Sequence, residues 1–446
     1  MSSNSSSDQV RTLQGAAQQA RSQSAPPAAP PAHPLIHFLG TPSEVCRHIA
    51  DLLDDAQLRA LASSLKGDYD IELRGETIQQ AIQRLITWPA TTDAARRALE
   101  RLDNPATSLT EHDKPTEPPE DPRYARARES LIAFAQLMFG KRFKIRKVTR
   151  LLAAKLEEAV RQVEGGGLAR KIINVPPRTG KTRLVSRLAT AWFMGRNPYL
   201  NVIVACHNTK LAAGIGDDVL TYIKSADYSR VFPGVRVSDS SGSKTEFKLI
   251  VTDEAGDHVG GEFGAYGRGG GYTGHGAHWL VLDDLMKETE VDSAAALEDV
   301  HVSIQALVSR LDPEGVSCVI VPNTRYRIND SCGYLLDDYA SEGPWDVVVA
   351  PLYAEEEKYL AVGKRKTEDG QTEDVLAQVA DHVLPPVMLL DGSELPGEVW
   401  TREPGDVLKP YTAEAAARHR ARLLRTRPNE FWGQYQQRPV AATGNM

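Results

Sequence analysis

The chain has 446 residues, of which 41% are hydrophobic, and its formal net charge is -7 at pH 7. This length predicts about two or three domains with buried cores. No apolar run approaches the roughly eighteen residues of a membrane-spanning helix, and the N-terminus lacks the basic and apolar segments of a secretion signal. These features argue against membrane and secreted classes and predict a soluble cytoplasmic protein. The scattered cysteines (Cys46, Cys206, Cys318 and Cys332) lack metal-binding spacing, so we expect reduced thiols without a chemical role.

Composition divides the first quarter of the chain into three segments. Residues 1–34 are rich in Ser, Gln, Ala and Pro, and we expect a disordered tail because they cannot bury enough apolar surface. Residues 35–104 contain stretches such as DAQLRALASSL, in which apolar side chains recur at helical spacing. This spacing predicts a small helical module. Residues 105–122 are rich in Pro, Asp, Glu and Thr, which is typical of a linker.

Apolar strands and amphipathic helices alternate after the linker. The β-branched runs are residues 171–175, 201–206, 278–282 and 317–322, and helical patterns occupy residues 130–139, 150–163, 181–193 and 293–311. Continuous apolar strands separated by helices predict an open α/β fold, with a mostly parallel sheet covered by helices on both faces. Ligands in such folds bind beyond the carboxyl ends of the strands.

The segment IINVPPRTGKT joins one of these strands to the next helix. Gly-Lys-Thr at a helix start is typical of a phosphate-binding loop, in which the lysine reaches the β and γ phosphates and the threonine binds Mg²⁺. Val175 replaces the first glycine of the usual pattern, but the prolines after it can fix the turn. A chance Gly-Lys-Thr is the alternative; the flanking strand and helix favour a nucleotide site. The expected binding residues are Pro177, Arg178, Thr179, Gly180, Lys181, Thr182 and Arg183.

The strand HWLVL is followed by Asp283 and Asp284. A phosphate loop needs a carboxylate from a neighbouring strand to hold its metal. Because adjacent side chains on a strand point to opposite faces, the two acids are expected to differ in role. We expect Asp283 to bind the metal, and Asp284 to orient or deprotonate the attacking water. A helix N-cap or a pair of surface acids is the structural alternative.

Asn323 and Thr324 follow the strand SCVIVP. An amide or hydroxyl at this strand end can hydrogen-bond the γ-phosphate or the catalytic water and so couple hydrolysis to movement; a simple turn is the alternative. Arg178 lies within the phosphate loop and can reach bound phosphates in cis. The expected catalytic residues are therefore Lys181, Asp284 and Arg178. An arginine finger from a neighbouring subunit cannot be named from the sequence.

Residues 260–279 form a glycine-rich stretch that leads into a strand. A dinucleotide-binding glycine loop opens a helix instead, so that interpretation is rejected. Two hypotheses remain: a flexible hairpin, or a loop that approaches a phosphate backbone with Tyr266, Arg268, Tyr272 and His275 available for contact.

Two stretches are strongly basic in this acidic chain, GKRFKIRKVTR at residues 140–150 and ARHRARLLRTR at residues 417–427. Each is either a solvated helix face or a nucleic-acid contact, and composition alone favours the solvated face.

In this order, NVPPRTGKT, AWFMGRNP, GGEFGAYGRGGGYTGHGAHWLVLDD, TRY and FWGQYQQRP resemble the large terminase subunit of tailed bacteriophages. The resemblance covers roughly residues 130 to 439. It implies a RecA-type P-loop ATPase domain over residues 123–355, followed by a small subdomain and linker over residues 356–446. It also implies an ATP-hydrolysing, Mg²⁺-dependent motor for double-stranded viral DNA. Its motifs place the phosphate loop, metal acid, catalytic acid and coupling residues on Arg178, Gly180, Lys181, Thr182, Asp283, Asp284, Asn323 and Thr324.

The resemblance also implies partners. These are double-stranded DNA, the portal protein, the small terminase subunit and further copies in a homo-oligomeric ring on the portal, within the cytoplasm of an infected or prophage-carrying bacterium. A helicase-like translocase, stimulated by single-stranded DNA, is one alternative. A nucleotide-controlled docking protein with incidental ATPase activity is the other.

The sequence departs from the family pattern in three places. Asp284 stands where related motors often have glutamate. The segment FKIRKVTRLL replaces the proline and paired histidines found near the adenine, so no adenine contact is assigned. YQQRP marks the passage to a nuclease domain in the family, and this sequence ends at Met446. Nuclease activity is therefore not expected from this chain, and two alternatives stay open: a nuclease domain removed at this boundary, or a separate nuclease polypeptide.

Overall fold

The computed structural model describes residues 120–239, 243–272, 274–313, 315–338, 343–367 and 369–439, together with two short antiparallel strands, β1 (Glu72–Leu73) and β2 (Glu76–Thr77). The chain divides into two compact units, Met1–Lys114 and Pro115–Met446, and each is described by itself. The expected tail, the helical module and most of the linker lie outside the described residues.

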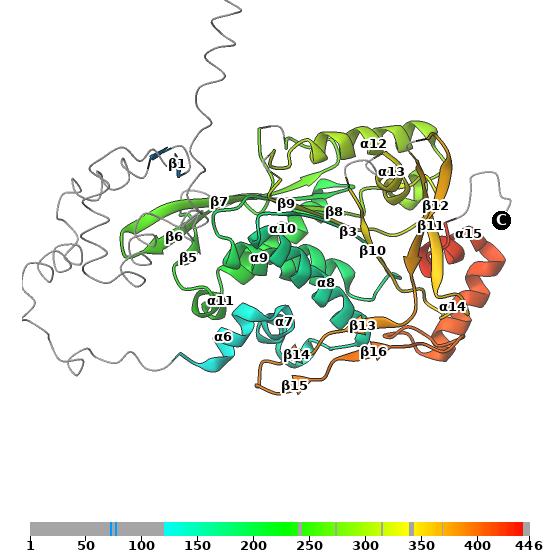
Figure 1. The fold of residues 1–446 in the computed structure, drawn as a ribbon, viewed down its shortest axis with the longest axis horizontal. Helices are drawn as coiled ribbons and strands as arrows, with labels where there is room; N and C mark the ends of the chain where they lie inside the picture. The colour runs from blue at the N-terminus through cyan, green and yellow to red at the C-terminus, as the bar shows by residue number, and fades with distance from the viewer. Residues whose placement is uncertain are drawn as a thin grey trace, which may run out of the picture. The chain divides into compact units, whose positions relative to one another are not determined.

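The second unit is built on an eight-stranded sheet with the order β10-β3-β9-β8-β4-β7-β6-β5 (Figure 1). The first six strands of that order are parallel to one another. At the other edge, β6 pairs antiparallel with both β7 and β5. The bounds are β3 (Leu168–Asn174), β4 (Val202–Cys206), β5 (Val235–Val237), β6 (Glu246–Asp253), β7 (Gly256–Gly267), β8 (Trp279–Asp283), β9 (Ser317–Pro322) and β10 (Asp346–Val349). The predicted strands and the mostly parallel sheet are confirmed.

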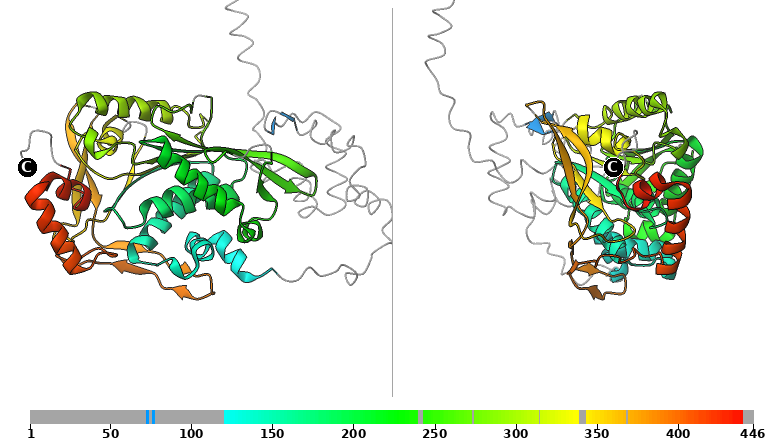
Figure 2. Two further views of the ribbon diagram at one scale, coloured as in Figure 1. Left: turned by 180° about the vertical axis from the view of Figure 1, so that it is seen from behind. Right: turned by 90° about the vertical axis from the view of Figure 1, so that its right-hand side faces the viewer.

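Helices cover both faces of the sheet, as Figures 1 and 2 show. One layer contains α6 (Pro122–Glu129), α7 (Leu131–Phe139), the 3-10 turn Gly140–Arg142, α8 (Lys147–Glu164), the π-helical segment Arg183–Ala189, α9 (Thr190–Arg196), α10 (Thr209–Ile223) and α11 (Ala226–Val231). The opposite layer contains α12 (Ala294–Val308) and α13 (Ser331–Asp338), with a 3-10 turn at Glu288–Glu290 before it. The predicted two-sided covering is confirmed.

Alternation along the strands explains why they are apolar throughout. Ile173, Val204 and Val281 face the core that includes α8 and α10, whereas their neighbours Ile172, Ile203 and Leu280 face the core that includes α12 and α13. Each strand is therefore buried on both faces, which removes the polar positions that a one-sided sheet would show.

The remaining chain forms hairpins and a helical segment. The hairpins pair β11 (Tyr359–Lys366) with β12 (Thr372–Gln378), β13 (His382–Leu384) with β16 (Glu398–Trp400), and β14 (Val387–Met388) with β15 (Glu394–Leu395). They are followed by α14 (Ala413–Thr426), α15 (Pro428–Glu430) and a π-helical turn, Phe431–Tyr435. Among the helices that the structure describes, none has the length and apolarity needed to cross a bilayer.

A buried ion pair fixes the loop between β9 and α13. The side chains of Arg325 and Asp330 are both 0% exposed, and Arg325 Nε lies 3.0 Å from Asp330 Oδ2. Arg325 also donates to the Val362 carbonyl in β11. Asp330 in turn accepts from the backbone N–H groups of Tyr326, Cys332 and Gly333. These contacts fix the position of the loop that carries Asn323 and Thr324.

Replacing Asp330 by alanine should lower the free energy of unfolding by about 3–5 kcal/mol, because the guanidinium of Arg325 would stay buried without a counter-charge. Urea unfolding followed by far-UV circular dichroism measures the change. The matched control is Asp292→Ala, which removes the exposed partner of Arg327 and should cost less than about 1 kcal/mol. Equal effects of the two substitutions would contradict the anchoring role.

Candidate nucleotide-binding site

The phosphate-loop segment turns sharply between β3 and the π-helical segment. Val175 is fully buried at the strand exit, and Arg178 and Gly180 have positive φ values of 63° and 94°. Thr179 Oγ1 donates to the Pro176 carbonyl over 2.9 Å, and the backbone N–H of Leu184 donates to the Gly180 carbonyl over 3.0 Å. Gly180 supplies a left-handed conformation that most residues resist, so the loop closes without the missing first glycine.

The ammonium group of Lys181 joins three parts of the sheet edge. Its side chain is 7% exposed, and Nζ lies 3.6 Å from Asp284 Oδ1. Nζ also donates to Thr324 Oγ1 over 3.3 Å. The loop after β3, the end of β8 and the loop after β9 therefore converge on one buried cation, as the carboxyl ends of adjacent parallel strands allow.

Asp283 is the last residue of β8 and is buried against the helix that follows the phosphate loop. Its Oδ2 accepts from Ser186 Oγ over 2.6 Å, and its Oδ1 accepts from Thr182 Oγ1 over 3.4 Å. Burial and the neighbouring Asp284 raise the pKa of Asp283 to about 7, whereas Lys181 and the two hydroxyls act in the opposite direction. Burial therefore favours the protonated form of this carboxyl group.

The donor set around Asp283 fits Mg²⁺. Magnesium binds proteins through one or two oxygen side chains and completes its shell with water and phosphate oxygens. Thr182 and Asp283 supply a hydroxyl and a carboxylate 3.4 Å apart. No group of three or more His, Cys, Asp and Glu with metal-binding geometry occurs in the part of the chain that the structure describes.

Asp284 adopts a left-handed backbone conformation, with φ 48°, directly after the strand. Its Oδ1 accepts the backbone N–H of Thr324 over 2.8 Å, and its carbonyl accepts from the backbone N–H of His207 over 3.2 Å. Asp284 Oδ2 has no hydrogen bond within the described residues, and the side chain is 28% exposed. One carboxylate oxygen is thus held in place and the other is left for a ligand.

The two expected coupling residues flank this arrangement. Thr324 contacts Lys181 and Asp284 as described, and the Asn323 carbonyl accepts from Asn174 Nδ2 over 3.1 Å. Asn323 is 1% exposed, and neither its amide nitrogen nor its amide oxygen has a partner among the described residues. A buried amide without partners is costly unless something else completes its hydrogen bonds.

Arg178 is not part of this cluster. It lies beside Tyr411, His419 and Tyr435, where its charge counteracts the burial that raises the pKa of Tyr411 to about 12. Tyr411 also donates to the Pro177 carbonyl over 2.5 Å. The structure therefore brings Lys181, Thr182, Asp283, Asp284 and Thr324 together, and places Arg178 and Pro177 against the C-terminal segment.

A cavity of about 260 Å³ opens on the Arg178 side of the loop. Its charged lining residues are all basic, and it also includes two aromatic rings. The lining comprises Phe139, Arg142, Phe143, Lys144, Arg146, Thr149, Leu152, Arg178, Thr179, Gly180, Arg183, Leu184 and Pro410. The guanidinium carbon of Arg183 lies 4.9 Å from the centre of the Phe139 ring. A small, cationic, partly aromatic cavity beside a phosphate loop suits a nucleoside and its phosphates.

This cavity explains part of the first basic stretch. Arg142, Lys144 and Arg146 line it, whereas Lys147 and Arg150 form ion pairs with Glu398. Lys141, Arg142, Lys144 and Lys147 are exposed, as expected for a solvated face, whereas Arg150 is buried. Phe139, Phe143 and Ser186 were missed in the sequence; the cluster of cations before the loop was the available signal for the cavity.

The glycine-rich stretch is partly a strand and partly irregular chain. Gly260 to Gly267 belong to β7, which pairs with β6 as the second strand of an antiparallel hairpin, so this half lies in a hairpin as the first hypothesis expected. Tyr266 and Tyr272 are buried. Arg268 is held by Glu290 and the Leu285 carbonyl, and His275 Nδ1 lies 3.3 Å from Glu262. Packing and ion pairing engage the four residues expected to contact a phosphate backbone.

No protein-family model and no curated protein sequence matches this chain. Among solved structures, one that matches is a mutant of the large terminase ATPase domain of Thermus phage P74-26. It is 16% identical over 42% of this chain and 67% of that chain, with a TM-score of 0.28.

Replacing Ser186 by alanine should lower the free energy of unfolding by about 1–3 kcal/mol, because one oxygen of the buried Asp283 carboxylate would lose its donor. Chemical denaturation measures the loss. Ser229→Ala removes an exposed hydroxyl that donates to a carbonyl three residues earlier and should change stability by less than about 0.5 kcal/mol. A neutral result for Ser186→Ala would mean that Asp283 does not depend on this hydroxyl.

Proposed function

We propose that the chain is an Mg²⁺-dependent ATPase motor of the terminase large-subunit type, which translocates double-stranded viral DNA. The observation that carries this proposal is the convergence of Lys181, Thr182, Asp283, Asp284 and Thr324 at the carboxyl edge of a parallel sheet. In a RecA-type P-loop ATPase, these positions bind phosphate and metal, provide the base and sense the γ-phosphate. The ATPase domain proposed from the sequence, residues 123–355, contains all of them.

The residues have separate tasks in the proposed reaction. Lys181 binds the β and γ phosphate oxygens, and the loop N–H groups from Gly180 onwards bind the phosphates at the helix N-terminus. Thr182 and Asp283 hold the metal, which when bound neutralises charge on the phosphate oxygens. Asp284 orients the attacking water with its unpaired Oδ2 and accepts a proton from it. The nucleobase and ribose occupy the cavity lined by Phe139, Arg142 and Arg183.

Coupling is proposed to run through Asn323 and Thr324. Thr324 links Asp284 and Lys181: its backbone N–H donates to Asp284, and its hydroxyl accepts from Lys181. A γ-phosphate that draws the Lys181 ammonium away would change both contacts. The Asn323 amide, which has no partner among the described residues, can bond the phosphate or the water. For Arg178, we propose that it binds phosphate when its side chain turns from the C-terminal segment towards Lys181.

Asp284→Asn should preserve ATP binding and lower kcat by at least about 100-fold, because the carboxylate that accepts the proton is removed. Asparagine tolerates the left-handed backbone conformation at this position, so the fold should be retained. Phosphate release measures turnover, and a fluorescent ATP analogue measures binding. Lys181→Ala is the contrasting variant: it should lose both binding and turnover. Normal hydrolysis by Asp284→Asn would show that the base lies elsewhere.

The motor itself is tested by the ATPase rate with and without linear double-stranded DNA. A motor for duplex DNA should hydrolyse ATP faster when that DNA is present, since the nucleic acid engages the working cycle. Stimulation by single-stranded DNA alone would favour a helicase-like translocase. An unchanged rate with either nucleic acid, together with stimulation by a portal or small-subunit protein, would favour a nucleotide-controlled docking protein. If duplex DNA raises the ATPase rate, the further partners are also proposed: other copies in a ring, the portal protein, the small subunit and a separate nuclease.

A further inference from the structure

We propose that the outward face of α14 binds the phosphate backbone of duplex DNA; the inference rests on the proposed function and names a surface that would carry it. Arg418, Arg422 and Arg425 are exposed on this helix. Their spacing of four and three residues places them on one face. Ala416 and Leu423, which are buried, lie on the opposite side of the helix, so the stripe of arginines points away from the protein.

The structure shows no neutralising partner of the stripe among the residues that it describes. None of its three arginines makes an ion pair within the described residues, and no Asp or Glu occurs from residue 415 to residue 429. Arg422 Nη2 contacts only the ring of His419, at 3.3 Å. By contrast, Arg427 at the end of the helix pairs with Glu288 and Glu430. Like charges four residues apart destabilise an isolated helix, and a polyanion would relieve that repulsion.

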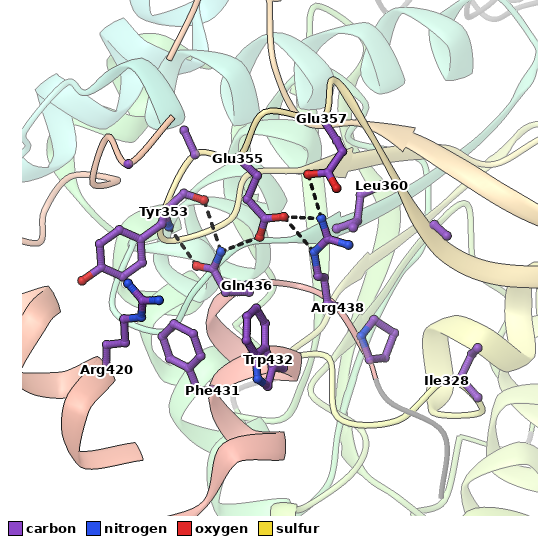
Figure 3. Close-up of a pocket in the computed structure, with 14 residues that line it drawn as sticks. Ile328, Tyr353, Glu355, Glu357, Leu360, Arg420, Phe431, Trp432, Gln436 and Arg438 are labelled. Carbon is purple, nitrogen blue, oxygen red and sulfur yellow. Dashed lines mark hydrogen bonds and ion pairs between the residues drawn. The ribbon is translucent and has the colours of Figure 1, made fainter. Parts of the chain in front are cut away.

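The fourth arginine of α14 points elsewhere. Arg420 lies over the rings of Tyr353 and Phe431, at 5.4 Å and 5.9 Å from their centres, in a cavity of about 730 Å³ (Figure 3). Figure 3 also shows Glu355 and Glu357 paired with Arg438 in that cavity, so both of its carboxylates are already engaged. These aromatic contacts orient the helix and leave the other three arginines on its outer side.

The dimensions and position of the stripe suit a DNA strand. Seven residues of helix span about 10 Å, and one strand of duplex DNA carries a charge every ~3.4 Å along its axis, which gives about three charges over that length. In Figures 1 and 2, α14 lies at the outer edge of the second unit. The residue before its N-cap, Tyr411, bonds the phosphate loop at Pro177. The surface is therefore attached directly to the nucleotide site.

The test measures binding of a linear duplex DNA of mixed sequence to the full chain over a series of salt concentrations. The variant R418Q/R422Q/R425Q keeps good helix formers and removes the three charges. Each phosphate contact contributes ~0.9 to the slope of log affinity against log salt. The triple variant should therefore show a slope shallower by about 2.7. Arg422→Gln alone should reduce the slope by ~0.9, and serves if the triple variant unfolds.

The control is R161Q/K224Q/R310Q, which removes three cations at the ends of α8, α10 and α12. These helix ends lie towards the amino edge of the sheet, away from the phosphate loop, and none of the three makes an ion pair within the described residues. This variant should keep the wild-type slope. Suppose that the affinity of the wild-type protein for duplex DNA falls steeply with salt and that R418Q/R422Q/R425Q keeps the same slope. Then α14 is not the DNA-binding surface, and the proposed function stands. If the wild type shows no salt-dependent binding, both fail.

Discussion

The buried ammonium group of Lys181 is the constraint on which the candidate site depends. A charge that is removed from water must be neutralised and hydrogen-bonded, or its desolvation destabilises the fold. Lys181 meets this need with Asp284 and Thr324, which follow two different strands. The same contacts that stabilise the lysine therefore hold Asp284 and the loop after β9 at the edge of the sheet. A phosphate group can then take over part of this role, since it offers the lysine a stronger anion.

Two residues with strained backbone conformations lie in the phosphate loop and at the end of β8. Arg178 and Asp284 are two of the four non-glycine residues with positive φ in the described chain. Such conformations cost of order 1–3 kcal/mol each and persist only where surrounding contacts determine them. Asp284 is held by Thr324 and His207, and the turn at Arg178 is held by the hydrogen bond from Tyr411 to Pro177. The left-handed conformation turns the Asp284 side chain towards Lys181. In a regular strand, this side chain would point to the opposite face.

The sequence predicted the sheet because burial on both faces leaves an unmistakable apolar run, as in 202–206. It predicted the cluster at the carboxyl edge because parallel topology brings strand ends together regardless of loop detail. It could not predict that Ser186 bonds Asp283, because that contact depends on the π-helical segment, whose hydrogen bonds join residues five apart. The role of the glycines in residues 260–267 also depends on tertiary contacts that the sequence does not show. Gly261 and Gly264 admit close neighbours at Leu200 and Tyr266, so these glycines serve packing within β7.

Two physical connections lead away from the cluster. Next to Thr324, the buried guanidinium of Arg325 bonds the Val362 carbonyl of β11, so the loop after β9 cannot shift without moving that hairpin or breaking a buried ion pair. In front, Tyr411 joins the phosphate loop to the start of α14, so a change in the loop reaches the arginine stripe within a few residues. A motor needs its nucleotide and its track to share rigid elements. Under the proposed function, the second connection is the shorter, because it crosses one hydrogen bond and one helix start.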